Sequence, residues 1–284
     1  MKEGKKIEVI KASKNKKLIA EAMNLNRKNI YSQSRREDSD MIVKSDIEKT
    51  FVVHPAYGHR RLGIELKMNH KKILRIMHKF NLTPPRLWYQ KKFTTQSDPA
   101  LFTLYSNLLK DLDLTAAAVG DIWSSDLTYI KFQGVFIYLV IIQDIISKEI
   151  VGFNLSNRHD SELVIKTLKE AVLKADHFPK IFHSDRGREY LSSDCIDYLE
   201  GNGTKISVSD PGSPWQNSWS ESFFSRVKME SGSFNRFETT GELVEYIFSY
   251  LSYYNNLRIH TTIKMSPYQF KLKISERGLE KRGT

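Results

Sequence analysis

Three strand-like segments in the middle of the chain limit the folds that it can adopt. Residues 122–132 show a strand pattern with polar interruptions, Gln133 and Gly134 predict a hairpin turn, and residues 135–143 are almost continuously β-branched or aromatic. A third strand is expected over residues 149–155. The short connections between these segments indicate three antiparallel strands.

Helix and strand patterns alternate in the next part of the chain. Residues 160–176 predict an amphipathic helix with Asp160 as its N-cap. A short strand, a helix, another strand, a Pro/Gly loop and a last helix follow, over residues 179–184, 192–201, 204–209, 210–216 and 217–231. With the antiparallel strands, this order indicates an α/β fold in which helices flank a mixed five-stranded sheet.

The positive charge of the chain is concentrated in its first third. The first 97 residues hold 23 Lys and Arg against 9 Asp and Glu, whereas the remaining residues hold 21 against 24. A solvated basic face is one explanation. So polarised a distribution favours the other, in which this third of the chain binds nucleic acid.

Helical patterns in this basic third predict two segments. Residues 1–40 have the spacing of a helix-turn-helix, in which Arg27 and Lys28 begin the second helix. Residues 41–97 predict a helical DNA-binding domain, with Ile42 and Ile47 at core positions, and end in a basic linker. The residues expected to line its outer faces and contact phosphates are Arg60, Arg61, Lys67, Lys71, Lys72 and Arg75. A connecting segment, residues 98–118, leads to the first strand.

Three acidic residues stand at positions that suit a binding site. Asp126 lies inside the first strand, although strands are poor in Asp and a buried carboxylate is costly unless it is paired or bound to a metal. Asp185 directly follows the fourth strand, at the end where α/β sheets present their ligands. Glu221 lies near the start of the last helix, on the face opposite Phe223 and Val227.

Each of these acids alone has a structural explanation, such as a hairpin hydrogen bond, a turn cap or a favourable helix N-terminus. Together they predict an oxygen-donor site for Mg²⁺ or Mn²⁺, because three converging carboxylates repel one another unless a cation lies between them. Two such ions about 4 Å apart can activate a water or a DNA 3′-hydroxyl and stabilise the leaving oxygen.

Other polar residues are given simpler interpretations. Asp144 is expected to be structural, and Cys195, the single cysteine, to be a buried thiol. His183 could touch the site or occupy a core position, and Arg258 could reach DNA. The longest apolar run, residues 135–146, is shorter than the roughly 20 residues that span a bilayer, so no membrane partner is expected.

Several sequence motifs resemble those of one known family. IWSSDLTYI, YLVIIQDIISKEIVGF, HSDRGREY, SPWQNSWSESFFSRVKME and YYNNLRIHTTIKMSPYQF occur in this order, and YGHRRLGIEL and LNRKNIYSQSRR precede them. In these motifs the chain resembles the integrase-like DDE transposases of bacterial insertion sequences, specifically the B-frame product of the class with two overlapping reading frames. Asp185 and Glu221 are separated by 35 residues, which is typical of that family and of retroviral integrases, and the basic Lys228 follows.

The resemblance implies a ribonuclease-H-like, integrase-type catalytic core over residues 119–272, including a C-terminal helix, and a tail over residues 273–284. Asp126, Asp185 and Glu221 would be its catalytic metal ligands for two Mg²⁺ or Mn²⁺ ions, with Lys228 near the DNA backbone. The sequence departs from the family in the Pro/Gly loop, where Asp210, Ser213, Gln216 and Ser218 replace the usual residues.

The activity implied is that of a DNA transposase, which cleaves double-stranded DNA at the terminal inverted repeats of its element and transfers the 3′ ends to target DNA. Two ends must be held at once, so a homo-oligomer on DNA is expected, with an upstream-frame helix-turn-helix protein as a further partner or fusion. The expected location is the bacterial cytoplasm, at the nucleoid. The alternatives are a ribonuclease-H-like nuclease without strand transfer and a non-catalytic DNA-binding regulator. The basic helical region argues against the first, and the retained acids argue against the second.

Overall fold

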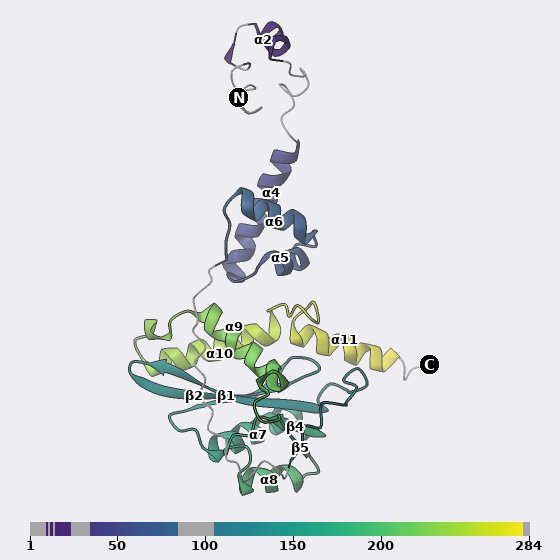
Figure 1. Ribbon diagram of the computed structural model, residues 1–284, viewed down its shortest axis with the longest axis vertical. Helices are drawn as coiled ribbons and strands as arrows, with labels where there is room; N and C mark the ends of the chain where they lie inside the picture. Colours follow the sequence, from purple (N-terminus) through teal and green to yellow (C-terminus); the bar gives the residue numbers. More distant parts are fainter. Residues whose placement is uncertain (1–9, 11, 14, 24–34, 85–104, 281–284) are drawn as a thin grey trace. The chain divides into compact units, whose positions relative to one another are not determined.

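The computed structural model describes residues 10, 12–13, 15–23, 35–84 and 105–280 (Figure 1). The chain divides into two compact units, Met1–Pro84 and Pro85–Thr284. The division falls within the Pro84-Pro85 pair, which cannot continue a helix. No helix in the described ranges is long and apolar enough to cross a lipid bilayer.

The first unit is helical. Helix α2 (Lys16–Ala22) packs Ala20 against Ile10. Helices α4 (Arg35–Val53), α5 (His59–Glu65) and α6 (His70–Lys79) lie further along the chain, and the Asn69 side chain caps α6 by accepting a hydrogen bond from the Lys71 N–H. The buried apolar side chains of these three helices and their connections are Val43, Ile47, Tyr57, Leu62, Ile73, Ile76 and Met77.

One of the two core positions predicted for α4 is confirmed and the other is wrong: Ile47 is buried, but Ile42 is not. Ile42, expected in the core, is 65% exposed, and Val43 is buried instead. The cause is Asp40, which is buried and accepts hydrogen bonds from Arg75 (2.8 Å) and Lys79 (3.0 Å) of α6. The Arg75 and Lys79 side chains hold the pKa of Asp40 well below its usual range. A polar residue therefore sets which face of α4 packs against α6.

The second unit is built on a five-stranded sheet with the order β3-β2-β1-β4-β5. Strands β1 (Ile122–Phe132), β2 (Val135–Asp144) and β3 (Ile150–Ser156) are antiparallel neighbours, whereas β4 (Ile181–Ser184) runs parallel to β1 and β5 (Lys205–Val208) parallel to β4. This is the mixed, ribonuclease-H-like sheet that the sequence predicted.

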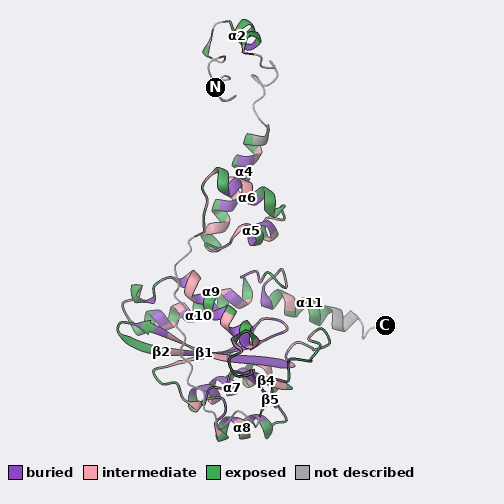
Figure 2. Ribbon diagram, viewed as in Figure 1, coloured by how far each residue is buried: buried purple, intermediate pink, exposed green. Residues whose placement is uncertain are grey.

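Helices cover both faces of the sheet (Figures 1 and 2). Along β2, Val140 and Ile142 face the core beneath α7 (Ser161–Ala175) and α8 (Ser193–Glu200), because successive strand residues point to opposite faces. Leu139 and Ile141 alternate with them and face the core beneath α9 (Ser218–Ser231) and α10 (Thr240–Asn256). Helix α11 (Pro267–Glu280) follows α10.

Two turns fix the register of the antiparallel strands. Gln133 and Gly134 both have positive φ, 47° and 86°, as a two-residue hairpin that follows the twist of its strands requires. At the other end of β2, the Asp144 carboxylate accepts hydrogen bonds from the N–H groups of Gly120 (2.6 Å) and Ile146 (2.7 Å). Asp144 is therefore structural, as predicted.

Candidate active site

Strand pairing brings Asp126 and Asp185 together on two neighbouring strands. Strands β1 and β4 are parallel neighbours, and Ser124 pairs with His183. Asp126 lies two residues beyond Ser124, and Asp185 lies two residues beyond His183, so both acids stand at the same level. Asp185, at the carboxyl end of β4, therefore lies beside Asp126 of β1. Ligand sites of α/β sheets commonly lie at the carboxyl ends of strands.

The start of α9, which carries Glu221, is tied to β1 by polar side chains. The Asn217 amide accepts a hydrogen bond from the Ser124 hydroxyl (2.7 Å) and donates one to the Ser125 carbonyl (3.2 Å). The hydroxyls of Ser124 and Ser220 are also hydrogen-bonded, at 3.1 Å. Glu221 follows Ser220 directly, in the first turn of α9. These contacts attach the third acid to the strand that carries the first.

The acids of this region act on one another electrostatically. Burial raises the pKa of Asp126, and the negative charges of Asp185, Glu221 and Glu189 raise it further. Burial also raises the pKa of Asp185. Single backbone donors oppose these effects: the Leu127 N–H lies 2.9 Å from Asp126 Oδ1, and the Gly187 N–H lies 3.0 Å from Asp185 Oδ1. The region therefore brings carboxyl groups close enough together to disfavour one another's negative charge.

Sequence reasoning missed Glu189 as part of this region. Burial raises the pKa of Glu189, and the charge of Asp185 adds to the effect. Its carboxyl group folds back over the turn after Asp185, since a Cβ atom at Gly187 would lie 2.7 Å from it. The signal was a fourth acid only four positions after Asp185. Asn217 was also missed, because its partners Ser124 and Ser125 are revealed only by the contact of the start of α9 with β1.

The donor chemistry of the region suits a hard divalent cation, which prefers carboxylate oxygens. Positive charge among Asp126, Asp185 and Glu221 would offset the interactions that raise the pKa of Asp126. Among the residues that the structure describes, however, no three or more carboxylate, imidazole or thiol side chains form a set arranged to hold a metal ion.

Lys228 lies on α9 beside β1. Its ammonium group donates a hydrogen bond to the Thr128 hydroxyl (2.7 Å) and lies 5.4 Å from the centre of the Tyr129 ring. Burial lowers the pKa of Lys228, and the charges of Tyr129 and Asp126 oppose that effect. Lys228 therefore stands on the same side of β1 as the start of α9.

His183 occupies a core position rather than the site. It is fully buried, and its ring nitrogens are hydrogen-bonded to the hydroxyls of Ser207 (2.8 Å) and Ser209 (3.2 Å). Burial lowers the pKa of His183 to about 4, so the ring is neutral at pH 7. Of the two predicted interpretations, the core position is correct. Cys195 is likewise buried, and burial raises its pKa to about 12.

Arg258 does not reach the surface, and the expectation that it could contact DNA is wrong. Its side chain is 2% exposed and pairs with Glu230 of α9, with Nε 3.0 Å from Oε2. The Tyr250 hydroxyl of α10 donates to the same carboxylate at 2.8 Å. This buried cluster holds the C-terminal half of α9.

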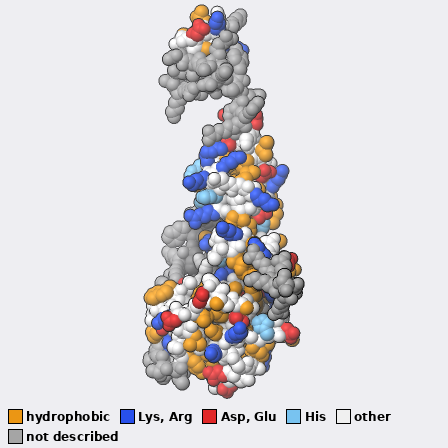
Figure 3. Space-filling view, turned by 90° about the vertical axis from the view of Figure 1, so that its right-hand side faces the viewer, with side chains coloured by type: hydrophobic (Ala, Val, Ile, Leu, Met, Phe, Trp, Pro, Cys, Tyr) orange, Lys and Arg blue, Asp and Glu red, His pale blue; other side chains and the backbone are white. Residues whose placement is uncertain are grey.

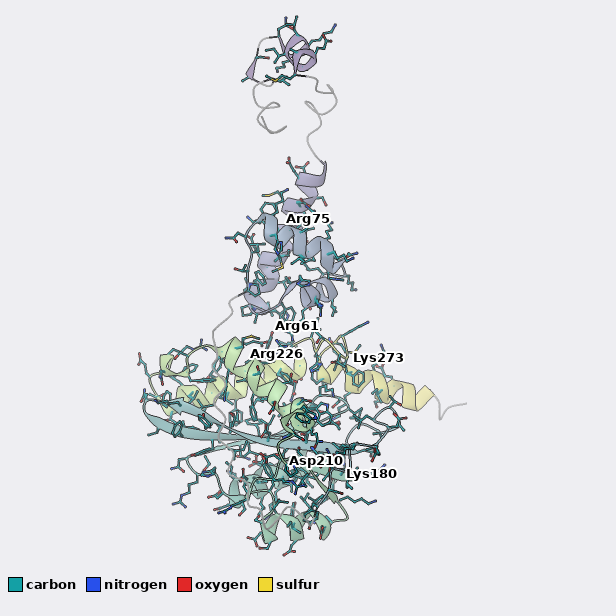
Figure 4. The ribbon with its side chains drawn as sticks, viewed as in Figure 1. Arg61, Arg75, Lys180, Asp210, Arg226 and Lys273 are labelled. Atoms are coloured by element: carbon teal, nitrogen blue, oxygen red, sulfur yellow. The ribbon has the colours of Figure 1, made fainter. Side chains whose placement is uncertain are left out.

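The predicted phosphate-contacting residues of the first unit have different environments. Arg60, Lys67, Lys71 and Lys72 are exposed, and Figure 3 shows Lys and Arg side chains spread over one face of this unit. Arg61 is only 9% exposed and its guanidinium lies over the Tyr57 ring, so its expected place on an outer face is wrong. Arg75, which is labelled in Figure 4, is partly exposed but bound to Asp40. Arg27 and Lys28 lie outside the described residues.

Comparison with known families places the integrase core domain on the second unit. Two family descriptions of an integrase core domain match the chain, one over residues 116–214 and the other over residues 202–267. Among solved structures, the catalytic core domain of HTLV-2 integrase in complex with magnesium is 17% identical, with a TM-score of 0.46. That match covers 54% of this chain and 97% of the HTLV-2 chain.

Two bacterial relatives match most of the chain. An uncharacterized transposase-like protein of Haemophilus influenzae is 33% identical over 74% of this chain and 96% of its own length. The transposase for insertion sequence element IS904 of Lactococcus lactis is 30% identical over 84% of this chain and 96% of its own length. With the integrase core domain and the ribonuclease-H-like sheet, these relatives establish that the chain belongs to the integrase-like DDE transposases of insertion sequences.

Proposed function

We propose that this chain is an active DNA transposase in which Asp126, Asp185 and Glu221 bind two Mg²⁺ or Mn²⁺ ions. It cleaves DNA at the ends of its element and joins the 3′ ends to target DNA. The observation that carries the proposal is the parallel pairing of β1 and β4, which sets Asp126 and Asp185 side by side. The effect of the Glu221 charge on the pKa of Asp126 supports its inclusion.

The residues of the chain prepare the site in three ways. The Leu127 N–H donates a hydrogen bond to one oxygen of Asp126, and the Gly187 N–H donates one to an oxygen of Asp185. These two hydrogen bonds orient the carboxylates. Asn217 ties the helix of Glu221 to β1. When bound, divalent ions supply activation of the attacking oxygen and stabilisation of the leaving oxygen. Lys228 provides a cation beside β1 for a backbone phosphate of the DNA.

The proposed partners follow from the same activity. Double-stranded DNA, both the terminal inverted repeats and the target, is held by the basic first unit, where Arg60, Lys71 and Lys72 are exposed. Two DNA ends require two active sites, so we propose a homo-oligomer on DNA, together with a helix-turn-helix protein from an upstream frame. The proposed location is the bacterial cytoplasm, at the nucleoid.

The test is joining of the element's own DNA ends to a target duplex in the presence of Mg²⁺. The wild-type chain should cleave and join. Asp185→Asn and Glu221→Gln should each lower both rates by a factor on the order of 10³, because charge stabilisation by bound ions contributes several kcal/mol. End-labelled oligonucleotides resolved on denaturing gels report cleavage and joining separately.

The matched control is Asp176→Asn. Asp176 is exposed at the end of α7 with φ of 61°, a conformation that Asn also adopts, so this variant should retain wild-type rates. Cleavage without joining would identify the chain as a nuclease. DNA binding with neither reaction would identify it as a regulator, and both results contradict the proposal.

A further inference from the structure

The loop between β5 and α9 ends in a short 3-10 helix, η2 (Pro214–Asn217), and is closed by Gln216. Its side-chain oxygen accepts a hydrogen bond from the Asp210 N–H (2.7 Å), and its side-chain nitrogen donates one to the Asp210 carboxylate (2.8 Å). The same oxygen accepts a hydrogen bond from the Asn107 amide (2.8 Å). Gln216 thus joins the two ends of the loop to each other and to a segment that lies before β1.

Lys110 of that same segment holds the other end of the loop through an ion pair with Asp210, which is labelled in Figure 4. The Lys110 and Gln216 side chains hold the pKa of Asp210 below its ordinary value. We call the four side chains Asn107, Lys110, Asp210 and Gln216 the clasp.

The segment that carries Asn107 and Lys110 is hydrogen-bonded to the sheet. The Leu108 N–H donates to the Ser207 hydroxyl of β5 (2.9 Å), and the Val208 N–H donates to the Ser106 carbonyl (3.2 Å). Leu109, between the two clasp residues of this segment, is buried against Ile122 and Ile145. The segment is therefore bound to the edge of the sheet, and through it the loop is bound to the sheet as well.

Helix α9 begins directly after the clasp. Gln216 precedes Asn217, whose amide is bonded to β1, and Glu221 lies in the first turn that follows. Trp215 is 67% exposed, so the side chain next to Gln216 does not pack the loop against the sheet. The polar contacts of the clasp hold the loop where Trp215 provides no apolar packing.

We infer that Asn107 and Lys110 are positioning residues, which hold Gln216 and Asp210 and thereby fix the start of α9 and the position of Glu221. This inference rests on the proposed function. The side chains of Asn107 and Lys110 are bonded to the loop and not to the acids of the candidate site, so they act on Glu221 through the loop.

A positioning role can be separated from a purely stabilising one. The Lys110 and Asp210 side chains are 50% and 31% exposed, and ion pairs of such exposure contribute little to the free energy of unfolding. Loss of the clasp should therefore leave the Tm almost unchanged. Misplacement of a group at a reaction centre, by contrast, can change a rate by one or two orders of magnitude.

The experiment compares Asn107→Ala, Lys110→Ala and the conservative Lys110→Arg in the full chain. The control is Lys180→Ala, which removes an equally charged residue from another surface ion pair, with Asp121 (2.9 Å), at the opposite end of the parallel strands. We measure kcat and KM for DNA joining in Mg²⁺, and hydrogen exchange of the Ser213 and Gln216 amides, which are bonded within the loop.

The two alanine variants should exchange these amides faster and lower kcat about tenfold with little change in KM. Lys110→Arg and Lys180→Ala should behave as wild type. Wild-type exchange in the alanine variants would overturn the clasp itself, and faster exchange with wild-type kcat would overturn its positioning role. If the wild-type chain joins no DNA, the proposed function fails and the catalytic part of this inference fails with it, while exchange still decides whether the clasp holds the loop.

Discussion

Individual residues near the candidate site are held by specific partners rather than by packing alone. His183 is the clearest case, because two serine hydroxyls flank its ring and no exposed surface remains on it. Its position two residues before Asp185 made a role in the site conceivable, but both ring nitrogens are engaged by Ser207 and Ser209 instead. Its titration therefore reports on folding.

Acidification should destabilise the second unit through His183. The unfolded chain takes up a proton near pH 6.5, whereas the folded chain does so only near pH 4, so stability is lost as pH falls between these values. The full effect is about 3 kcal/mol. Urea unfolding at several pH values should show that the wild type loses about this much more than His183→Gln.

Parallel pH profiles of the two proteins would contradict this account of His183. The control for the His→Gln substitution itself is His159→Gln, because the His159 ring is exposed and packs against Tyr138 at 4.8 Å between centroids.

At the scale of secondary-structure elements, α9 is the element on which the site depends. Its first turn is bonded to β1 through Asn217 and Ser220, and its C-terminal half is bonded through Glu230 to Arg258 and to Tyr250 of α10. Phe223 and Val227 face the core between these two attachments. Polar contacts at both ends and apolar contacts between them fix the helix along its length and around its axis.

Removal of Arg258 should destabilise this arrangement strongly. Arg258→Met leaves the Glu230 carboxylate buried without its cation, which costs about 3–5 kcal/mol. The double variant Arg258→Met, Glu230→Gln should recover part of that loss, because no charge stays buried. Chemical denaturation followed by circular dichroism measures both effects.

Lys180→Ala provides the comparison, since the Lys180 side chain is 75% exposed and its ion pair with Asp121 should contribute at most about 1 kcal/mol. A loss for Arg258→Met as small as that of Lys180→Ala would show that the buried cluster does not hold α9.

At the scale of the whole molecule, the elements were predictable and the pairing of polar side chains was not. Strand and helix periods are local, so the sheet, α7 and α9 follow from the sequence within one or two residues at each end. The partners Asp40 and Arg75 lie 35 positions apart, and Glu230 and Arg258 lie 28 apart. Such pairs depend on helix packing, which is why Ile42 and Arg258 were assigned to the wrong surroundings.

The candidate site could be predicted from the sequence in part. Asp126, Asp185 and Glu221 were selected because an acid inside a strand, an acid directly after a strand and an acid near a helix start are local features of the sequence. The order of strands explains why the first two are neighbours. Glu189 and Asn217 join them only through the turn after β4 and the contact of α9 with β1. The N-terminal DNA-binding assignments stay predictions, with Arg60, Lys71 and Lys72 on the surface.

The most direct test of the shared metal site is Mn²⁺ binding, followed by electron paramagnetic resonance, in the full chain bound to a DNA end. We expect the wild type and Asp176→Asn to bind two ions per chain. Asp126→Asn, Asp185→Asn and Glu221→Gln should each lose at least one of them, because each removes a negatively charged oxygen ligand. Unchanged Mn²⁺ binding by any of these three variants would contradict the assignment of that residue to the site.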